Sequence, residues 1–182
     1  MELIRIGDKL ISLRKINSTL EKIFALRMEG CSQQEVANRL QIDRTFVSRL
    51  ESIGEVRKGS RIAVVGFPVL NKEELLDVLK ENSVEFQLLM TEEERQQFIT
   101  GKSGAELLSD FMEIVAQVRE YDVVVILGSN YRIKISEAML DREVVGMVIG
   151  DSPITKDVYV DPAKLRELLA SLAVTEKRRR AK

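Results

Sequence analysis

Glycine and small polar residues gather at three points where short apolar runs of the sequence end. These points read GFP (66–68), GSN (128–130) and GDSP (150–153). In an open parallel sheet a ligand binds beyond the carboxyl ends of the strands, and glycine lets it approach the backbone. The pattern therefore predicts a crevice for a polar small molecule, formed by Gly66, Gly128, Ser129, Asn130, Gly150, Asp151 and Ser152. The same residue types populate plain β–α turns, so a purely structural role stays open.

The residue types that most often carry out catalysis are scarce in this chain. It contains no histidine, the commonest general base and an ordinary zinc ligand, and one cysteine, Cys31. A lone cysteine cannot form an internal disulfide, and we expect Cys31 to be a small buried apolar residue. Carboxylates are plentiful, but those at 71–77 and 91–95 lie where helix starts favour acidic residues. We therefore assign no catalytic residue, cofactor or metal, and do not expect an enzyme.

Three nucleotide- or phosphate-handling motifs can be tested against the sequence. GKSG at 101–104 resembles the end of a phosphate loop, but the earlier glycine that this loop requires is Gln96. GFPVLN at 66–71 lacks the G-x-G-x-x-G of dinucleotide-binding proteins. A phosphate-receiving domain would need an acidic pair after its first strand and an aspartate after its third, and neither is present. All three classes are disfavoured.

The residues after 60 alternate between short apolar runs and amphipathic segments. This alternation is typical of β–α units, and runs that are apolar on both faces suit strands covered by helices on both sides. The predicted strands are 61–67, 84–90, 122–128, 143–150 and 157–160, and the predicted helices are 71–82, 91–120, 131–140 and 161–172. We expect a Rossmann-like, doubly wound, mainly parallel α/β domain over residues 59–174, followed by a disordered basic tail at 175–182.

Three helices are predicted ahead of this domain, in a first domain that spans residues 1–58. They cover 17–28, 33–40 and 44–52. Their expected starts are a capping box at Ser18 and Glu21, a second at Ser32 and Glu35, and a cap at Asp43. The segment before them, LIRIGDKLISLRK, carries Leu10 and Leu13 at a helical spacing, and it is either an extra helix or a dimerisation arm.

The spacing of residues in the second and third helices meets the steric requirements of a helix-turn-helix. Such a unit needs a small residue where its helices cross, an apolar residue in the turn, and apolar anchors on both inner faces. Counting from Gln33, these positions hold Val36, Ala37, Leu40, Ile42, Val47 and Leu50. Residues 18–52 thus resemble the helix-turn-helix of Cro and phage-repressor-like regulators, in a pared-down three-helix form. Gln41 stands where glycine is usual, so it either adopts a left-handed conformation or the turn differs.

The resemblance implies which side chains would contact DNA. The third helix would lie in the major groove, where Arg44, Thr45, Ser48 and Arg49 would meet base edges. Gln33 and Gln34 at the start of the second helix would face phosphates, with Arg39, Arg57 and Lys58 as further phosphate contacts. One unit contacts few base pairs, so the resemblance also implies a homodimer, with the α/β domain as the expected dimer contact.

The distribution of charge agrees with a first domain that binds DNA and an α/β domain that does not. Residues 1–60 hold 11 Lys and Arg against 8 Asp and Glu, whereas residues 61–176 hold 12 against 21, and KRRRAK adds five positive charges. A polyanion is therefore attracted to the ends of the chain and repelled by its middle.

We accordingly expect a transcriptional regulator that binds double-stranded DNA as a homodimer, with a possible small-molecule effector. No apolar run approaches the roughly 18 residues of a membrane span, and no signal peptide is apparent, so we expect a cytoplasmic protein. The alternatives are a protein-interaction adaptor that uses the helical domain and, less favoured, a nucleotide-processing enzyme.

Overall fold

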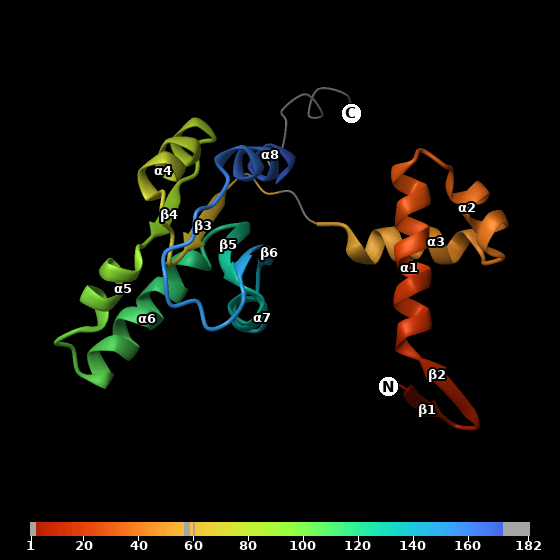
Figure 1. Cartoon of the computed structure of the whole chain (residues 1–182), viewed down its shortest axis with the longest axis horizontal. Helices are drawn as coiled ribbons and strands as arrows, with labels where there is room; N and C mark the ends of the chain where they lie inside the picture. The colour runs from red at the N-terminus through yellow and green to blue at the C-terminus, as the bar shows by residue number, and fades with distance from the viewer. Residues whose placement is uncertain (1–2, 57–58, 60, 173–182) are drawn as a thin grey trace. The chain divides into compact units, whose positions relative to one another are not determined.

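The computed structural model describes residues 3–56, 59 and 61–172 (Figure 1). The chain divides into two compact units between Glu55 and Val56, close to the boundary expected at residue 58. Arg57, Lys58 and the basic tail lie outside the described residues. Each unit is described by itself below.

The first unit begins with a two-stranded ribbon. β1 (Leu3–Ile6) pairs antiparallel with β2 (Lys9–Ser12), with Leu3 opposite Ser12 and Ile6 opposite Lys9. Gly7 forms the turn with a φ of 57°, a conformation that glycine adopts without strain. Of the two alternatives left open for this segment, the extra helix is therefore wrong, and the segment is a ribbon that runs directly into the first helix.

The first helix starts earlier than its sequence indicated. α1 spans Leu13–Met28, and the hydroxyl of Ser12 accepts a hydrogen bond from the Lys15 N–H. The predicted capping box at Ser18 is wrong, because Ser12 already provides a cap where the ribbon ends and Ser18 lies inside the helix.

Two shorter helices follow, joined by a tight turn. α2 (Gln33–Leu40) has the expected capping box at its start, and α3 (Arg44–Gly54) follows Asp43, whose side chain makes no capping hydrogen bond. Gln41, in the turn, has φ 55° and ψ 45°, the left-handed conformation that the sequence left as one of two options. Its N–H bonds to the Ala37 carbonyl, which ends α2.

The second unit is built on a four-stranded parallel sheet with the order β4-β3-β5-β6. Its strands are β3 (Ile62–Gly66), β4 (Phe86–Leu89), β5 (Val123–Ser129) and β6 (Glu143–Gly150). All four lie within one or two residues of their predicted bounds. Every residue of β5 is buried, as a strand covered on both faces requires.

Helices pack on both faces of this sheet. The helices of this unit are α4 (Lys72–Glu81), α5 (Glu92–Ile99), α6 (Gly104–Val118), α7 (Asn130–Met139) and α8 (Pro162–Leu172), of which α5 has no buried residue. Side chains of α4 and α8 share one buried cluster with Val64, Val125 and Leu127, while side chains of α6 and α7 share another with Val124 and Ile126. Alternate residues of the same strands thus supply two cores, one on each face of the sheet.

Two predictions for this unit are wrong in detail. The single helix expected over 91–120 is two helices, because Gly101 adopts a φ of 82° and Ser103 starts α6 with a new capping box. Residues 157–160 form no strand but a single parallel bridge between Val158 and Val69. Pro68 supplies a carbonyl to this bridge and has no N–H for a longer ladder.

Candidate nucleic-acid interface

The helices α1, α2 and α3 are held together by a small apolar core. Ile23, Val36 and Val47 are fully buried at its centre. Leu26, Cys31, Leu40, Ile42 and Leu50 pack against them while partly buried, and Ala37 is buried as well. The six positions chosen from the sequence as inner contacts of α2 and α3 therefore all point inward. Cys31 is a half-buried packing residue.

A polar clamp ties the three helices at one side of this core. Glu51 of α3 accepts a hydrogen bond from the Arg27 guanidinium of α1, and its other carboxylate oxygen accepts one from Gln33 of α2 at 2.7 Å. The Arg27 guanidinium also donates to the Cys31 carbonyl. The hydrogen bonds from Arg27 and then Gln33 hold the pKa of the Glu51 carboxyl below its usual range. The orientation of α3 relative to α1 and α2 is thus fixed by charge as well as by apolar packing.

This clamp engages Gln33, one of the two residues expected to contact phosphates at the start of α2. The Gln33 amide is engaged with Glu51, and the Gln34 amide donates to Asn38 at 2.9 Å on the surface of the same helix. Glu35 closes the capping box, and hydrogen bonds from Ser32 lower the pKa of its carboxyl. A carboxylate at this helix end repels a phosphate, so the start of α2 is a weaker phosphate site than the sequence indicated.

The outward side of α3 has a different character. Arg44, Thr45 and Arg49 are exposed, and Ser48 is half-buried among them. Within the described part of the chain, none of the side chains of Arg44, Thr45 and Arg49 has a hydrogen bond or an ion pair, so their donors remain available to a ligand. Arg39, exposed in the last turn of α2, can add a positive charge nearby.

One member of this surface was not predicted from the sequence. Ser52 lies one turn beyond Ser48 on the same side of α3, and its exposed hydroxyl donates to the Ser48 carbonyl at 3.0 Å. The four-residue spacing between Ser48 and Ser52 places both on one side of a helix. Ser52 was nevertheless not counted among the outward residues, because the helix was expected to end at residue 52. Arg44, Thr45, Ser48, Arg49 and Ser52 are called the α3 face below.

The second predicted site, at the carboxyl edge of the sheet, is brought together only in part. Register places Ser129 opposite Gly150, and Gly66 opposite Leu127 on the adjacent strand. Ser129 is 1% exposed, and its hydroxyl accepts from the Arg132 N–H at 3.3 Å, so it caps α7. A Cβ on Gly66 would lie 2.8 Å from the Leu127 Cβ, so this glycine serves packing.

The remaining expected ligand residues lie at the ends of β5 and β6, at the start of α7 and in the loop after β6. Asn130, Asp151 and Ser152 are exposed. Gly128 and Gly150 have side chains of their own unit at ordinary contact distance from where a Cβ would stand. The residues at this edge thus fit their structural role, which the sequence had left open beside ligand binding.

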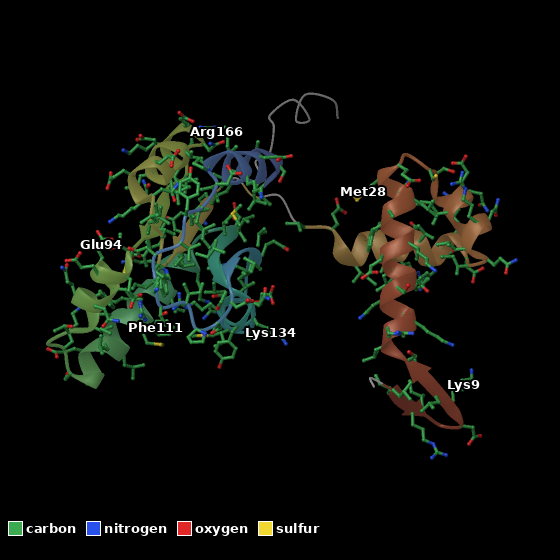
Figure 2. All side chains as sticks on the ribbon, viewed as in Figure 1. Lys9, Met28, Glu94, Phe111, Lys134 and Arg166 are labelled. Atoms are coloured by element: carbon green, nitrogen blue, oxygen red, sulfur yellow. The ribbon has the colours of Figure 1, made fainter. Side chains whose placement is uncertain are left out.

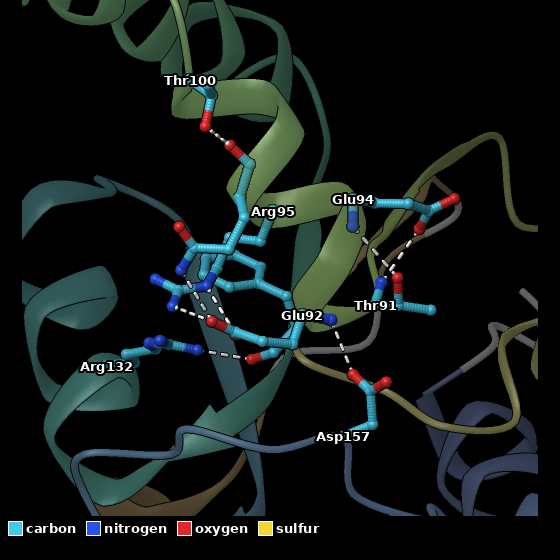
Figure 3. Close-up of polar contacts among 9 residues, drawn as sticks. Thr91, Glu92, Glu94, Arg95, Thr100, Arg132 and Asp157 are labelled. Carbon is cyan, nitrogen blue, oxygen red and sulfur yellow. Dashed lines mark hydrogen bonds and ion pairs between the residues drawn. The ribbon is translucent and has the colours of Figure 1, made fainter.

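A network of charged side chains that the sequence did not indicate covers this edge (Figure 3). The Glu92 carboxylate accepts two hydrogen bonds from Arg95, at 2.9 and 2.6 Å, and the Glu92 N–H donates to Asp157 at 2.6 Å. The Arg132 guanidinium lies 4.4 Å from the Phe67 ring centre and donates to the Phe67 carbonyl. Burial, and then the charge of Arg95, lower the pKa of Arg132. These groups satisfy one another, which supports a stabilising role.

Replacing Glu92 by glutamine is expected to weaken the dependence of stability on acid pH. Hydrogen bonds from Arg95 and then Gln96 lower the pKa of Glu92 to about 2. A carboxyl whose pKa is lower in the folded state stabilises the fold above its unfolded pKa, and this contribution disappears as the pH falls from about 5 to about 2. Urea unfolding at pH 6 and pH 3 should therefore show a smaller acid-induced loss for Glu92→Gln than for the unmodified chain. The neighbouring, exposed Glu93→Gln is the control, and an equal effect of both changes would refute this role for Glu92.

No helix among the described residues is long and apolar enough to cross a membrane. The same residues contain no group of side chains that could hold a metal ion. In comparisons with known proteins, no family model, no curated protein and no solved structure matches this chain.

Proposed function

We propose that the protein is a sequence-specific, DNA-binding transcriptional regulator that acts as a homodimer through a helix-turn-helix formed by α2 and α3. The observation that carries this proposal is the α3 face, where two exposed arginines with available donors lie beside three small hydroxyl residues on one side of the helix. Arginine can bind guanine through two hydrogen bonds, and hydroxyls serve as short donors or acceptors. The tight turn and the inward anchors support the helix-turn-helix assignment.

The second unit is proposed to dimerise and to respond to a signal. The parallel strand order β4-β3-β5-β6, with helices on both faces, supports the assignment of this unit as a doubly wound, Rossmann-like domain. A ligand that favours one arrangement of the dimer would change the occupancy of DNA by its differential affinity for the two arrangements. Because the carboxyl edge of this sheet is filled by its own side chains, such a ligand would have to displace the network around Glu92 and Arg132.

The dependence of binding on salt tests the proposal against a protein-interaction adaptor. Contacts to several phosphates release counterions, so the affinity for a mixed-sequence duplex should fall at least about tenfold between 50 and 200 mM salt. Fluorescence anisotropy of a labelled duplex measures this change. An absence of duplex binding at low salt would contradict the proposal and favour the adaptor.

A further inference from the structure

The positive charge of the first unit is concentrated at its N-terminal end. Residues 3–15, which form the ribbon β1–β2 and the start of α1, hold four Lys and Arg against one Asp. Residues 16–56, which form the rest of the three helices, hold five Lys and Arg against six Asp and Glu. DNA carries one negative charge per about 1.7 Å of its axis, and proteins bind it by neutralising phosphates with Lys and Arg. The helices of this unit have no net positive charge with which to do so.

Few of the basic residues in the helices are available for phosphates. Of the five Lys and Arg in residues 16–56, one is engaged with Glu51 in the polar clamp, and two are the proposed base contacts of the α3 face. The start of α2 carries the Glu35 carboxylate, which repels a phosphate. Half to two-thirds of the hydrogen bonds in protein–DNA interfaces go to phosphates and sugars. A DNA reader built on α2 and α3 therefore needs phosphate contacts from another part of the chain.

The basic side chains of residues 3–15 are available for such contacts. They are Arg5, Lys9, Arg14 and Lys15, and they are called the basic segment below. All four are exposed, and none forms an ion pair within the part of the chain that the structure describes. The Arg5 guanidinium donates a hydrogen bond to the Gly7 carbonyl at 3.3 Å, in the turn of its own ribbon. Figure 2 shows Lys9 on the ribbon, clear of the helices of the first unit.

The basic segment begins beside the α3 face. Lys15 and Phe46 line the same hollow between α1 and α3, and Arg49 neighbours Phe46 on the surface of α3, three positions further along. The ribbon continues beyond the N-terminal end of α1 (Figure 1), and its four-residue strands extend about 13 Å. The major groove is about 12 Å wide, so phosphates along its edge lie within this reach when α3 occupies the groove.

We propose that the basic segment is a second DNA-contacting element, which binds phosphates beside the groove that α3 reads. It rests on the proposed DNA binding and supplies the phosphate contacts that the helices lack. Contacts to phosphates fix the position of a protein on the duplex but carry no sequence information. The basic segment thus strengthens binding to every duplex, while the α3 face selects the sequence.

The salt dependence of duplex binding by the full-length protein tests this proposal. Fluorescence anisotropy gives the slope of log K against log salt for the preferred duplex and for a mixed-sequence duplex. Each phosphate contact contributes about 0.9 to the magnitude of this slope, so the double variant Arg5→Gln and Lys9→Gln should lower it by about 2. The affinities for both duplexes should fall by the same factor, whereas Arg44→Ala should also reduce their ratio.

Two further variants separate loss of charge from loss of structure. Asp8→Asn removes the one acidic side chain of residues 3–15, and it should raise the affinity for both duplexes by about twofold. A gain of affinity cannot result from a misfolded ribbon. The matched control is the double variant Lys134→Gln and Lys164→Gln, which removes two charges from exposed positions of the second unit and should leave the slope unchanged.

The outcomes distinguish a failure of this proposal from a failure of readout by α3. A slope that is unchanged in the ribbon variant, or lowered as much in the control, would overturn the role of the basic segment and leave readout by α3 intact. A lowered slope, together with an unchanged affinity ratio in Arg44→Ala, would support the basic segment and contradict readout by α3. An absence of duplex binding at low salt would overturn both.

Discussion

Replacing Arg44 or Arg49 by alanine is expected to lower the affinity of the protein for its preferred duplex by about 10- to 100-fold. Both side chains are exposed on α3 and have no partner among the described residues, so neither change should disturb the fold. A bidentate contact between arginine and guanine contributes about 1–3 kcal/mol of discrimination. Fluorescence anisotropy at one fixed salt concentration measures the loss.

Lys22→Ala is the matched control for these two changes. Lys22 is exposed on α1 in the same unit, so its replacement removes the same charge from a position outside the α3 face. It should weaken binding by much less. If all three variants lost affinity equally, binding would reflect general attraction between the first unit and a polyanion, and direct readout by α3 would be refuted.

Replacing Ile23 by alanine is expected to lower the free energy of unfolding of the first unit by about 2–5 kcal/mol. Ile23 is fully buried on α1 and contacts the cluster formed with Val36 and Val47, so the substitution leaves a cavity between the three helices. Urea unfolding followed by helical circular dichroism should show the change as a lower transition midpoint. Loss of this core would also release α3, so DNA binding should fall with it.

Ile53→Ala provides the comparison for the same chemical change at the surface. Ile53 is 83% exposed near the end of α3, and its replacement should alter the free energy of unfolding by no more than about 0.5 kcal/mol. Equal shifts for the two variants would contradict the account of the Ile23 cluster as the core that positions α3.

The sheet of the second unit was predictable from sequence because its strands leave a strong local signal. Val123 to Leu127 are apolar at every position, as suits a strand covered on both faces, and β5 has that environment. The helical spacing of Val36, Leu40 and Val47 was equally informative, since each side chain points into the core of the first unit.

The ribbon was missed because two local signals in it compete. Leu10 and Leu13 have a helical spacing, whereas Ile4 and Ile6 alternate and Gly7 with Asp8 can form a tight turn. In the structure the alternation prevails up to Ser12, and the helical spacing only from Leu13 onward. In a short segment without a buried face, the sequence alone does not decide between a strand and a helix.

The partners of polar side chains were the least predictable part of the candidate sites. Gln33 was assigned to phosphates, but its amide donates to Glu51, 18 residues away. Ser129 was assigned to a ligand, but it caps α7, and Glu92 and Asp157 meet only in the fold. The type of a residue indicates which partners its side chain can bind. Only the tertiary packing decides which of these partners lies within reach.

The most direct test of the proposed function is to select bound fragments from a random duplex library with the purified full-length protein, beside its Arg44→Ala and Arg49→Ala variants. We expect enrichment of a two-fold-symmetric sequence, with half-sites about 10 base pairs apart, that both variants lose. If no sequence is enriched, or if the variants enrich the same sequence equally well, α3 does not read DNA and the account is contradicted.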